Sequence, residues 1–164
     1  MRMPDDLEAA FNDQITMELA SSAAYLQMSA FLADANLDGM SAWMRAQSEE
    51  EREHALRFLD FVLDRGNRVT LTGSDAPRGD FEGPEEVFAT ALGQEEAVTK
   101  AIHDLYRLAS ERGDLASYPF LQEFIQEQNE EETTVASILE RIRMAGDDSG
   151  AMLILDNELG SRAG

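Results

Sequence analysis

The stretch Glu50-Glu51-Arg52-Glu53-His54 decides the fold, because it places a carboxylate and an imidazole within a long helical pattern of apolar residues. Residues three apart share a face of a helix, so Glu51 and His54 lie on the same face. That face carries Met40, Met44, Gln47, Glu51, His54, Phe58 and Phe61. Burying a carboxylate and an imidazole costs free energy unless something compensates them. Both groups are metal ligands, so the pattern predicts a bound cation.

Three other helical patterns show the same interruption by an oxygen-bearing residue on an otherwise apolar face. The four predicted helices and their polar residues are about 5–34 with Glu18, about 39–65 with Glu51, about 85–112 with Glu95 and about 116–144 with Gln128. Each polar residue lies within about 5 Å of its helix midpoint, at a rise of about 1.5 Å per residue. Four helices packed side by side therefore bring these residues to one level. The pattern predicts a metal site in the core of a four-helix bundle.

The turns between the helices predict the topology. Asn36-Leu37-Asp38-Gly39 and the short link after Gly113 are tight connections, which make the flanking helices antiparallel. The stretch of about 66–84 has no helical period. Fully extended, it spans about 59 Å, whereas a helix of about 28 residues is about 42 Å long. It can therefore cross the whole bundle and make the second and third helices parallel. Gly146 ends the fourth helix, and a short fifth helix of about 149–159 completes one all-α domain over residues 1–164.

Composition and charge narrow the possible functions. The chain has 164 residues, of which 43% are hydrophobic, enough for one sizeable core. No apolar run approaches the roughly 18 residues of a membrane span, and the N-terminus lacks the apolar segment of a secretory signal, so we expect a cytoplasmic protein. The net charge of −20 argues against binding nucleic acid or an anionic membrane surface. It favours attraction of cations, although an acidic surface also simply keeps a helical protein soluble.

Four motifs give the chain a resemblance to a known family. They are Met17-Glu18-Leu19-Ala20-Ser21-Ser22 followed by Tyr25, Glu50-Glu51-x-x-His54, Gln94-Glu95, and Glu127-Gln128-Asn129-Glu130-Glu131. Together they make the whole chain resemble the ferritins, specifically the non-haem bacterial ferritins. The resemblance implies a ferritin-like four-helix bundle with one long crossover loop and a short C-terminal fifth helix. It also implies a ferroxidase that oxidises Fe(II) with O2 or H2O2. Ferric oxyhydroxide mineral would collect inside a hollow homo-oligomeric cage, a 24-mer.

The same resemblance assigns residues to iron sites. Iron site A is Glu18, Glu51 and His54, and site B is the bridging Glu51 with Glu95 and Gln128. A third, weaker iron site is implied for Glu50, Glu127 and Glu130, with Glu131 as a further candidate ligand. In the family, a tyrosine placed like Tyr25 neighbours the di-iron site and can act in electron transfer. The residues alone are equally compatible with Tyr25 being an ordinary core side chain.

Two departures from related patterns define the subtype. A symmetric di-iron bundle takes a Glu-x-x-His from each of two helices, whereas the fourth helix here offers Gln128-x-x-Glu131. A neutral amide binds iron less strongly than a carboxylate, so we expect site B to release its iron more readily. Haem-containing bacterioferritins place a methionine directly after the bridging glutamate. Arg52 stands at that position here, so we predict no haem.

Three alternatives are distinguished by what they would require. A di-iron oxidoreductase or peroxidase of the rubrerythrin-like type should show a second Glu-x-x-His and a substrate cavity beside it. A purely structural four-helix protein should have leucine or alanine at positions 18, 51, 54 and 95. A DNA-protecting miniferritin takes its ligands from two subunits and lacks a full set within one bundle. The sequence favours the ferritin interpretation over all three.

Overall fold

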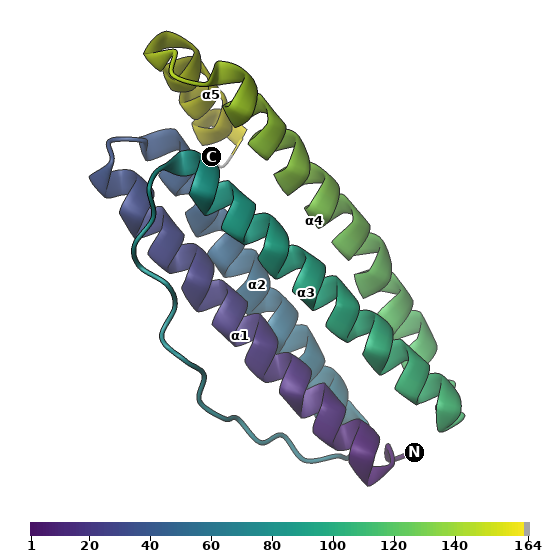
Figure 1. Cartoon of the computed structure of the whole chain (residues 1–164). Coiled ribbons are helices and arrows are strands. Elements are labelled where there is room, and N and C mark those ends of the chain that lie inside the picture. The colour runs from purple at the N-terminus through teal and green to yellow at the C-terminus, as the bar shows by residue number, and fades with distance from the viewer. Residues whose placement is uncertain (163–164) are drawn as a thin grey trace.

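The computed structural model describes residues 1–162, and these residues form five helices and no strand (Figure 1). The helices are α1 (Asp5–Asp34), α2 (Asp38–Asp64), α3 (Pro84–Glu111), α4 (Ser117–Ala145) and α5 (Ser149–Arg162). The predicted all-α class is confirmed. The bounds of α1 to α4 differ from the predicted ones by at most one residue, while α5 continues beyond the predicted residue 159. Residues 163–164 of the predicted domain lie outside the described residues.

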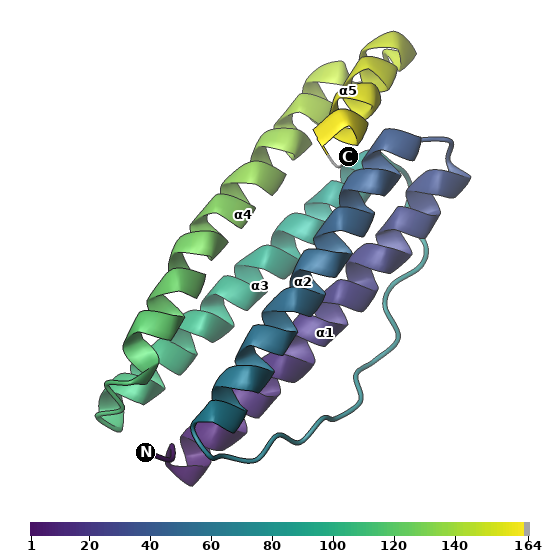
Figure 2. The same ribbon diagram turned by 180° about the vertical axis from the view of Figure 1, so that it is seen from behind.

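The four long helices pack as two antiparallel pairs, α1 with α2 and α3 with α4 (Figures 1 and 2). The crossover between α2 and α3 runs along the outside of the bundle for most of its length, which makes these two helices parallel. The loop length predicted this connection. In the described part of the chain, no helix is both long enough and apolar enough to cross a lipid bilayer.

Paired serines hold α1 close against α2. The hydroxyl of Ser22 donates to the carbonyl of Ser48 at 2.7 Å, and the hydroxyl of Ser48 donates to the carbonyl of Ser22 at 2.7 Å. Ser29 and Ser41 repeat the exchange at 2.9 and 2.8 Å. Small side chains let the helix backbones approach, and each hydroxyl finds a partner in the interface. The pair α1–α2 is therefore fixed in register on the α5 side of the level of Glu18 and Glu51.

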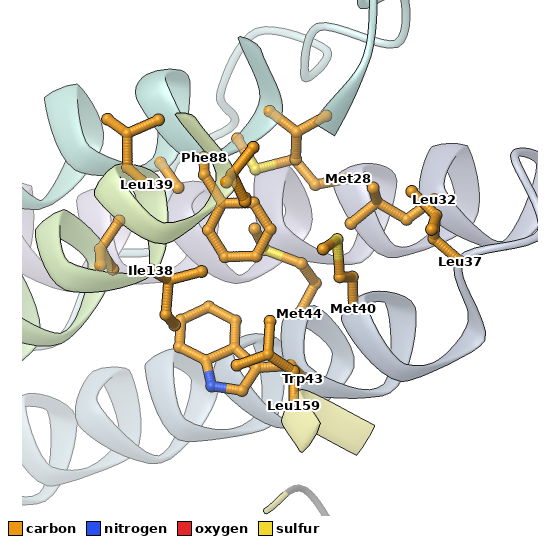
Figure 3. Close-up of a cluster of buried hydrophobic side chains, with 14 of the residues drawn as sticks. Met28, Leu32, Leu37, Met40, Trp43, Met44, Phe88, Ile138, Leu139 and Leu159 are labelled. Atoms are coloured by element: carbon orange, nitrogen blue, oxygen red, sulfur yellow. The ribbon is translucent and has the colours of Figure 1, made fainter. Parts of the chain in front are cut away.

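The core consists of two hydrophobic clusters on either side of a polar layer. This layer contains the buried side chains of Glu18, Glu51, His54, Glu95 and Gln128. One cluster lies towards α5 and includes Trp43, which packs on Phe88 with ring centroids 5.5 Å apart (Figure 3). The other lies towards the N-terminus and is built around Phe11 and Phe58. The residues predicted on the inward face of α2 are buried except for Phe61, which is half-buried, and Glu131 of the pattern Gln128-x-x-Glu131 is half-buried as well. Both exceptions lie at the edge of the bundle, where Phe61 stacks on the half-buried Phe120.

A buried ion pair closes the end of the bundle opposite α5. The guanidinium of Arg65, just after α2, donates to both carboxylate oxygens of Asp114 in the α3–α4 turn, at 3.0 and 2.5 Å. Each side chain is 9% exposed, and Arg65 also donates to the carbonyl of Met1 at 2.7 Å. The Arg65 guanidinium holds the pKa of the Asp114 carboxyl below its usual range. The pair joins the N-terminus, α2 and the α3–α4 turn.

The fifth helix caps the start of α2. The carboxylate of Asp156 accepts the backbone N–H of Met40 at 2.7 Å and that of Gly39 at 3.2 Å. Leu37, at the N-cap position of α2, has no side-chain acceptor of its own, so the cap comes from α5. This approach requires glycine, because a Cβ on Gly39 would lie 1.8 Å from the carbonyl oxygen of Asp156.

We expect Gly39→Ala to loosen α5 from the bundle. The added methyl meets backbone, which cannot yield as a flexible side chain would, so the change should cost about 1–3 kcal/mol. Gly93→Ala is the matched control, because that glycine lies within α3 and a Cβ there meets nothing within 4 Å. The control should be neutral or stabilising by up to about 1 kcal/mol. Hydrogen exchange of the α5 amides measures the loosening of α5, and thermal unfolding measures the change in stability, for both variants. Unchanged exchange in Gly39→Ala would contradict the prediction.

Candidate metal centre

The helices α1 and α2 bring three ligand-type side chains together in the polar layer. Glu18 of α1 and Glu51 of α2 are fully buried, and His54, one turn further along α2, is 4% exposed. One ligand atom of each lies within 4.8 Å of the other two. Nδ1 of His54 is 3.6 Å from Oε2 of Glu51. The structure therefore brings together the three residues that the family resemblance implies for iron site A.

The helices α3 and α4 supply a second, hydrogen-bonded half. Glu95 is fully buried and accepts hydrogen bonds from the hydroxyl of Tyr25 and from Nε2 of Gln128, the latter at 3.1 Å. The same Nε2 is 3.3 Å from Oγ1 of Thr99. These contacts orient the Gln128 amide so that its nitrogen faces α3 and its oxygen is free. Tyr25 therefore donates a hydrogen bond directly to a predicted ligand, which distinguishes it from an ordinary core side chain.

Five buried polar atoms in this layer have no hydrogen-bond partner. They are Oε2 of Glu18, both carboxylate oxygens of Glu51, Nδ1 of His54 and Oε1 of Gln128. An unpaired buried polar atom costs about 1–3 kcal/mol, and natural proteins contain few of them. All five atoms carry lone pairs that can coordinate a cation. Carboxylate, imidazole and amide oxygen form a donor set that suits a divalent transition metal such as iron.

The electrostatics of the layer also favour a cation. Burial, with repulsion from Glu51, raises the pKa of Glu18 well above its usual range. Burial raises the pKa of Glu51 to about 8, and repulsion from Glu95, Glu131 and Glu50 adds to this effect. Burial also raises the pKa of Glu95, although the hydrogen bonds from Tyr25 and Gln128 oppose the change. A bound cation would reverse these shifts because it stabilises the charged carboxylates.

The four residues predicted for a third iron site have different surroundings. Glu50 and Glu130 are exposed, and Glu131 accepts a hydrogen bond from Nε2 of Gln47 at 2.9 Å. Glu127 accepts two hydrogen bonds from Arg57 and lies 3.5 Å from Nε2 of His54. Within residues 1–162, these four carboxylates form no group as tight as that of Glu18, Glu51 and His54. The third site stays a prediction.

Three side chains with roles in the layer were given none by the sequence analysis. Nε2 of Gln14 donates to Oε1 of Glu18 at 2.7 Å, and Gln47 bonds Glu131. Both glutamines stand four residues before a predicted ligand, Glu18 or Glu51, a repeated spacing that could have indicated them. Arg57 had no comparable indication, because its partners lie on α4 and are 66 and 70 residues away along the chain.

Comparison with known proteins defines the class. Residues 8–145 match the ferritin-like domain family. The chain therefore belongs to the ferritin family, as the fold and the polar layer indicate.

The relatives narrow the class further. The bacterial non-heme ferritin of Staphylococcus haemolyticus is 33% identical over 158 residues, covering 96% of this chain and 95% of that protein. The bacterial non-heme ferritin of Bacteroides fragilis is 34% identical, covering 96% and 98%. Among solved structures, an open pore ferritin from the hyperthermophilic archaeon Archaeoglobus fulgidus superposes with a TM-score of 0.95 at 39% identity, covering 96% of each chain. Within the family, the chain groups with the non-haem bacterial ferritins.

Proposed function

We propose that this protein stores and detoxifies iron by oxidising Fe(II) to Fe(III) and keeping the product as ferric oxyhydroxide inside a hollow shell. The observation that carries this proposal is the set of unpaired, buried acceptor atoms on Glu18, Glu51, His54 and Gln128. A purely structural bundle would fill these positions with apolar side chains. The relatives named as non-heme ferritins support the same function.

We assign the first iron to Glu18, Glu51 and His54, and the second to Glu51, Glu95 and Gln128. Each Fe(II) gives up one electron, and O2 or H2O2 accepts the pair. Carboxylates suit this step because they bind both oxidation states and hold Fe(III) more strongly as its charge rises. Each iron then has two carboxylates and one neutral donor, and the neutral donor of the second iron is the amide oxygen of Gln128.

Hydrogen bonds from neighbouring side chains position these ligands. Gln14 fixes one oxygen of Glu18 and leaves the other free, and Tyr25 and Gln128 fix the carboxylate of Glu95. Such outer contacts orient ligands and tune affinity. Tyr25 is also close enough to Glu95 to be a source of an electron or a proton during oxidation. We propose that role for it, and no haem is part of the scheme.

The rubrerythrin-like alternative is less well supported. It calls for a second Glu-x-x-His, but α4 presents Gln128 and the half-buried Glu131 at that spacing. Ferritins, by contrast, match this chain over nearly its whole length.

Assembly into a cage of twenty-four copies is part of the proposal. The outer faces of α1 and α2 expose leucines spaced seven residues apart, Leu19 with Leu26 and Leu56 with Leu63, at 37–51% exposure. Apolar side chains repeated along a helix surface indicate a contact with another molecule. Native mass spectrometry should find a large closed oligomer. A monomer at micromolar concentration would contradict the cage and leave the metal centre untouched.

The test of the activity is Fe(II) oxidation under air at neutral pH. The metal-free protein should oxidise Fe(II) faster than buffer and keep the Fe(III) in solution as a high-mass species. Absorbance of the ferric product and iron content after gel filtration measure the two effects. Oxidation no faster than in buffer would exclude the proposed function.

A further inference from the structure

Arg57 holds a carboxylate that the proposed third iron site needs. Its guanidinium donates to both oxygens of Glu127, at 3.0 and 2.9 Å, and to Oε2 of Glu123 at 3.2 Å. The guanidinium carbon also lies 4.2 Å from the ring centroid of Phe124, which places the cation on an aromatic face. Two ion pairs and one cation–π contact together fix the position of this side chain.

This arrangement of Arg57 on Glu127 and Glu123, called the Arg57 clamp below, lies beside the proposed iron site A. Oε2 of Glu127 is 3.5 Å from Nε2 of His54, and the His54 ring meets Phe124 edge-on at a centroid distance of 5.3 Å. Among the described residues, no other arginine or lysine forms an ion pair with a predicted metal ligand. Arg57 is therefore the one arginine or lysine of the described chain that is paired with a predicted ligand. Its partner, Glu127, lies next to the imidazole of His54.

A metal ion and the guanidinium would compete for the same oxygens. Both oxygens of Glu127 face Arg57, so a cation can bind this carboxylate fully only after the guanidinium has left. Glu123 offers the place to which it can move, because it precedes Glu127 by one turn of α4 and already accepts one of the hydrogen bonds. Phe124, on whose ring the guanidinium already lies, is the direct neighbour of Glu123 in sequence.

We propose that Arg57 is a movable counter-ion that sets the metal affinity of the third site by passing from Glu127 to Glu123. This inference rests on the proposed function and on the third iron site predicted from the sequence, since it assumes that Glu127 is a metal ligand. In the metal-free protein, the ion pair between Arg57 and Glu127 must break before a metal ion can bind Glu127. The Arg57 clamp therefore lowers the affinity of the third site. It acts on the first two metal ions only indirectly, because their proposed ligands form no hydrogen bond or ion pair with Arg57. The third site is thereby weakened by a specific residue and not only by exposure.

Calorimetric titration of the assembled, metal-free protein with Zn(II) tests the proposal. Arg57→Gln should tighten the third binding event by roughly three- to tenfold and should change the first two by less than that. Arg52→Gln is the matched control: it removes the same charge from an exposed position of α2 that forms no ion pair in the described structure. If the two variants tighten the third event equally, the effect is general electrostatics and the proposal is wrong.

A second variant tests where the guanidinium goes. Glu123→Gln removes the receiving carboxylate, so it should weaken the third event by roughly three- to tenfold beyond the exposed control Asp60→Asn. A crystal structure of the zinc-loaded protein should show Arg57 on Glu123 alone. An intact Arg57–Glu127 pair beside an occupied third site would overturn the proposal. Absence of the first two binding events in the unmodified protein would instead overturn the proposed metal centre.

Discussion

Replacing Glu51 by alanine should abolish the fast phase of Fe(II) oxidation, with an expected loss of at least about a hundredfold in rate. Glu51 is the one carboxylate proposed to bind both irons, and neither of its oxygens has a hydrogen-bond partner. Its removal therefore leaves each iron without a full ligand set. Stopped-flow oxidation at two Fe(II) per subunit measures this phase directly.

Glu130→Ala is the matched comparison. Glu130 is exposed on α4 and belongs only to the proposed third site, so the first phase should stay nearly intact. The change should appear in the oxygen stoichiometry or in the slower turnover at a large excess of iron. Equal loss of the fast phase in both variants would show that the third site is not separate from the first two. Circular dichroism and native mass of both variants exclude loss of folding or assembly as the cause.

The sequence predicted the helices and the inward faces well, because a period of 3.6 residues determines which side chains share a face. Glu18, Glu51 and Glu95 are fully buried where the pattern placed them. The level of the site was also predictable, since a constant rise per residue converts position in sequence to height in the bundle. The crossover followed from loop length alone.

The contacts around the site were not predictable in the same way. Whether Glu131 is fully or half buried depends on how far α2 and α4 stand apart, which no local pattern specifies. The contact of Arg57 with Glu127 depends on which faces of α2 and α4 meet, and these helices are distant in sequence. The contact of Asp156 with the start of α2 depends on the angle of α5. Side chains that bridge elements require the tertiary arrangement, whereas side chains that share one helix do not.

The polar layer also predicts how stability depends on pH. In the metal-free protein, the pKa of Glu51 is raised from 4.5 to about 8, and that of Glu18 is raised as well. The folded state therefore binds more protons than the unfolded state between these values. The free energy of unfolding should fall as pH rises through this window, on the order of 2–5 kcal/mol in total. The melting temperature should drop by roughly 5–15 °C.

Bound metal should remove or reverse this dependence of stability on pH. A divalent ion replaces the protons on Glu18 and Glu51, so its binding releases protons and grows stronger as pH rises. With saturating Zn(II), the melting temperature should rise or stay level over the same pH range, since ligand binding stabilises the folded state by mass action. Scanning calorimetry from pH 5 to pH 8.5, with and without Zn(II), measures both curves.

Glu51→Gln separates the carboxylate cluster from the other charges of this acidic chain. It keeps the size of the side chain but removes the buried titrating group, so the metal-free pH dependence should flatten and the zinc effect should shrink. Asp60→Asn, which removes a charge from an exposed position of α2, should change neither. If the melting temperature of the metal-free protein does not change between pH 5 and pH 8.5, and Zn(II) does not change it either, Glu18 and Glu51 do not lie close together as described. If Asp60→Asn flattens the curve as strongly as Glu51→Gln, the net charge of −20 is responsible and not the buried layer.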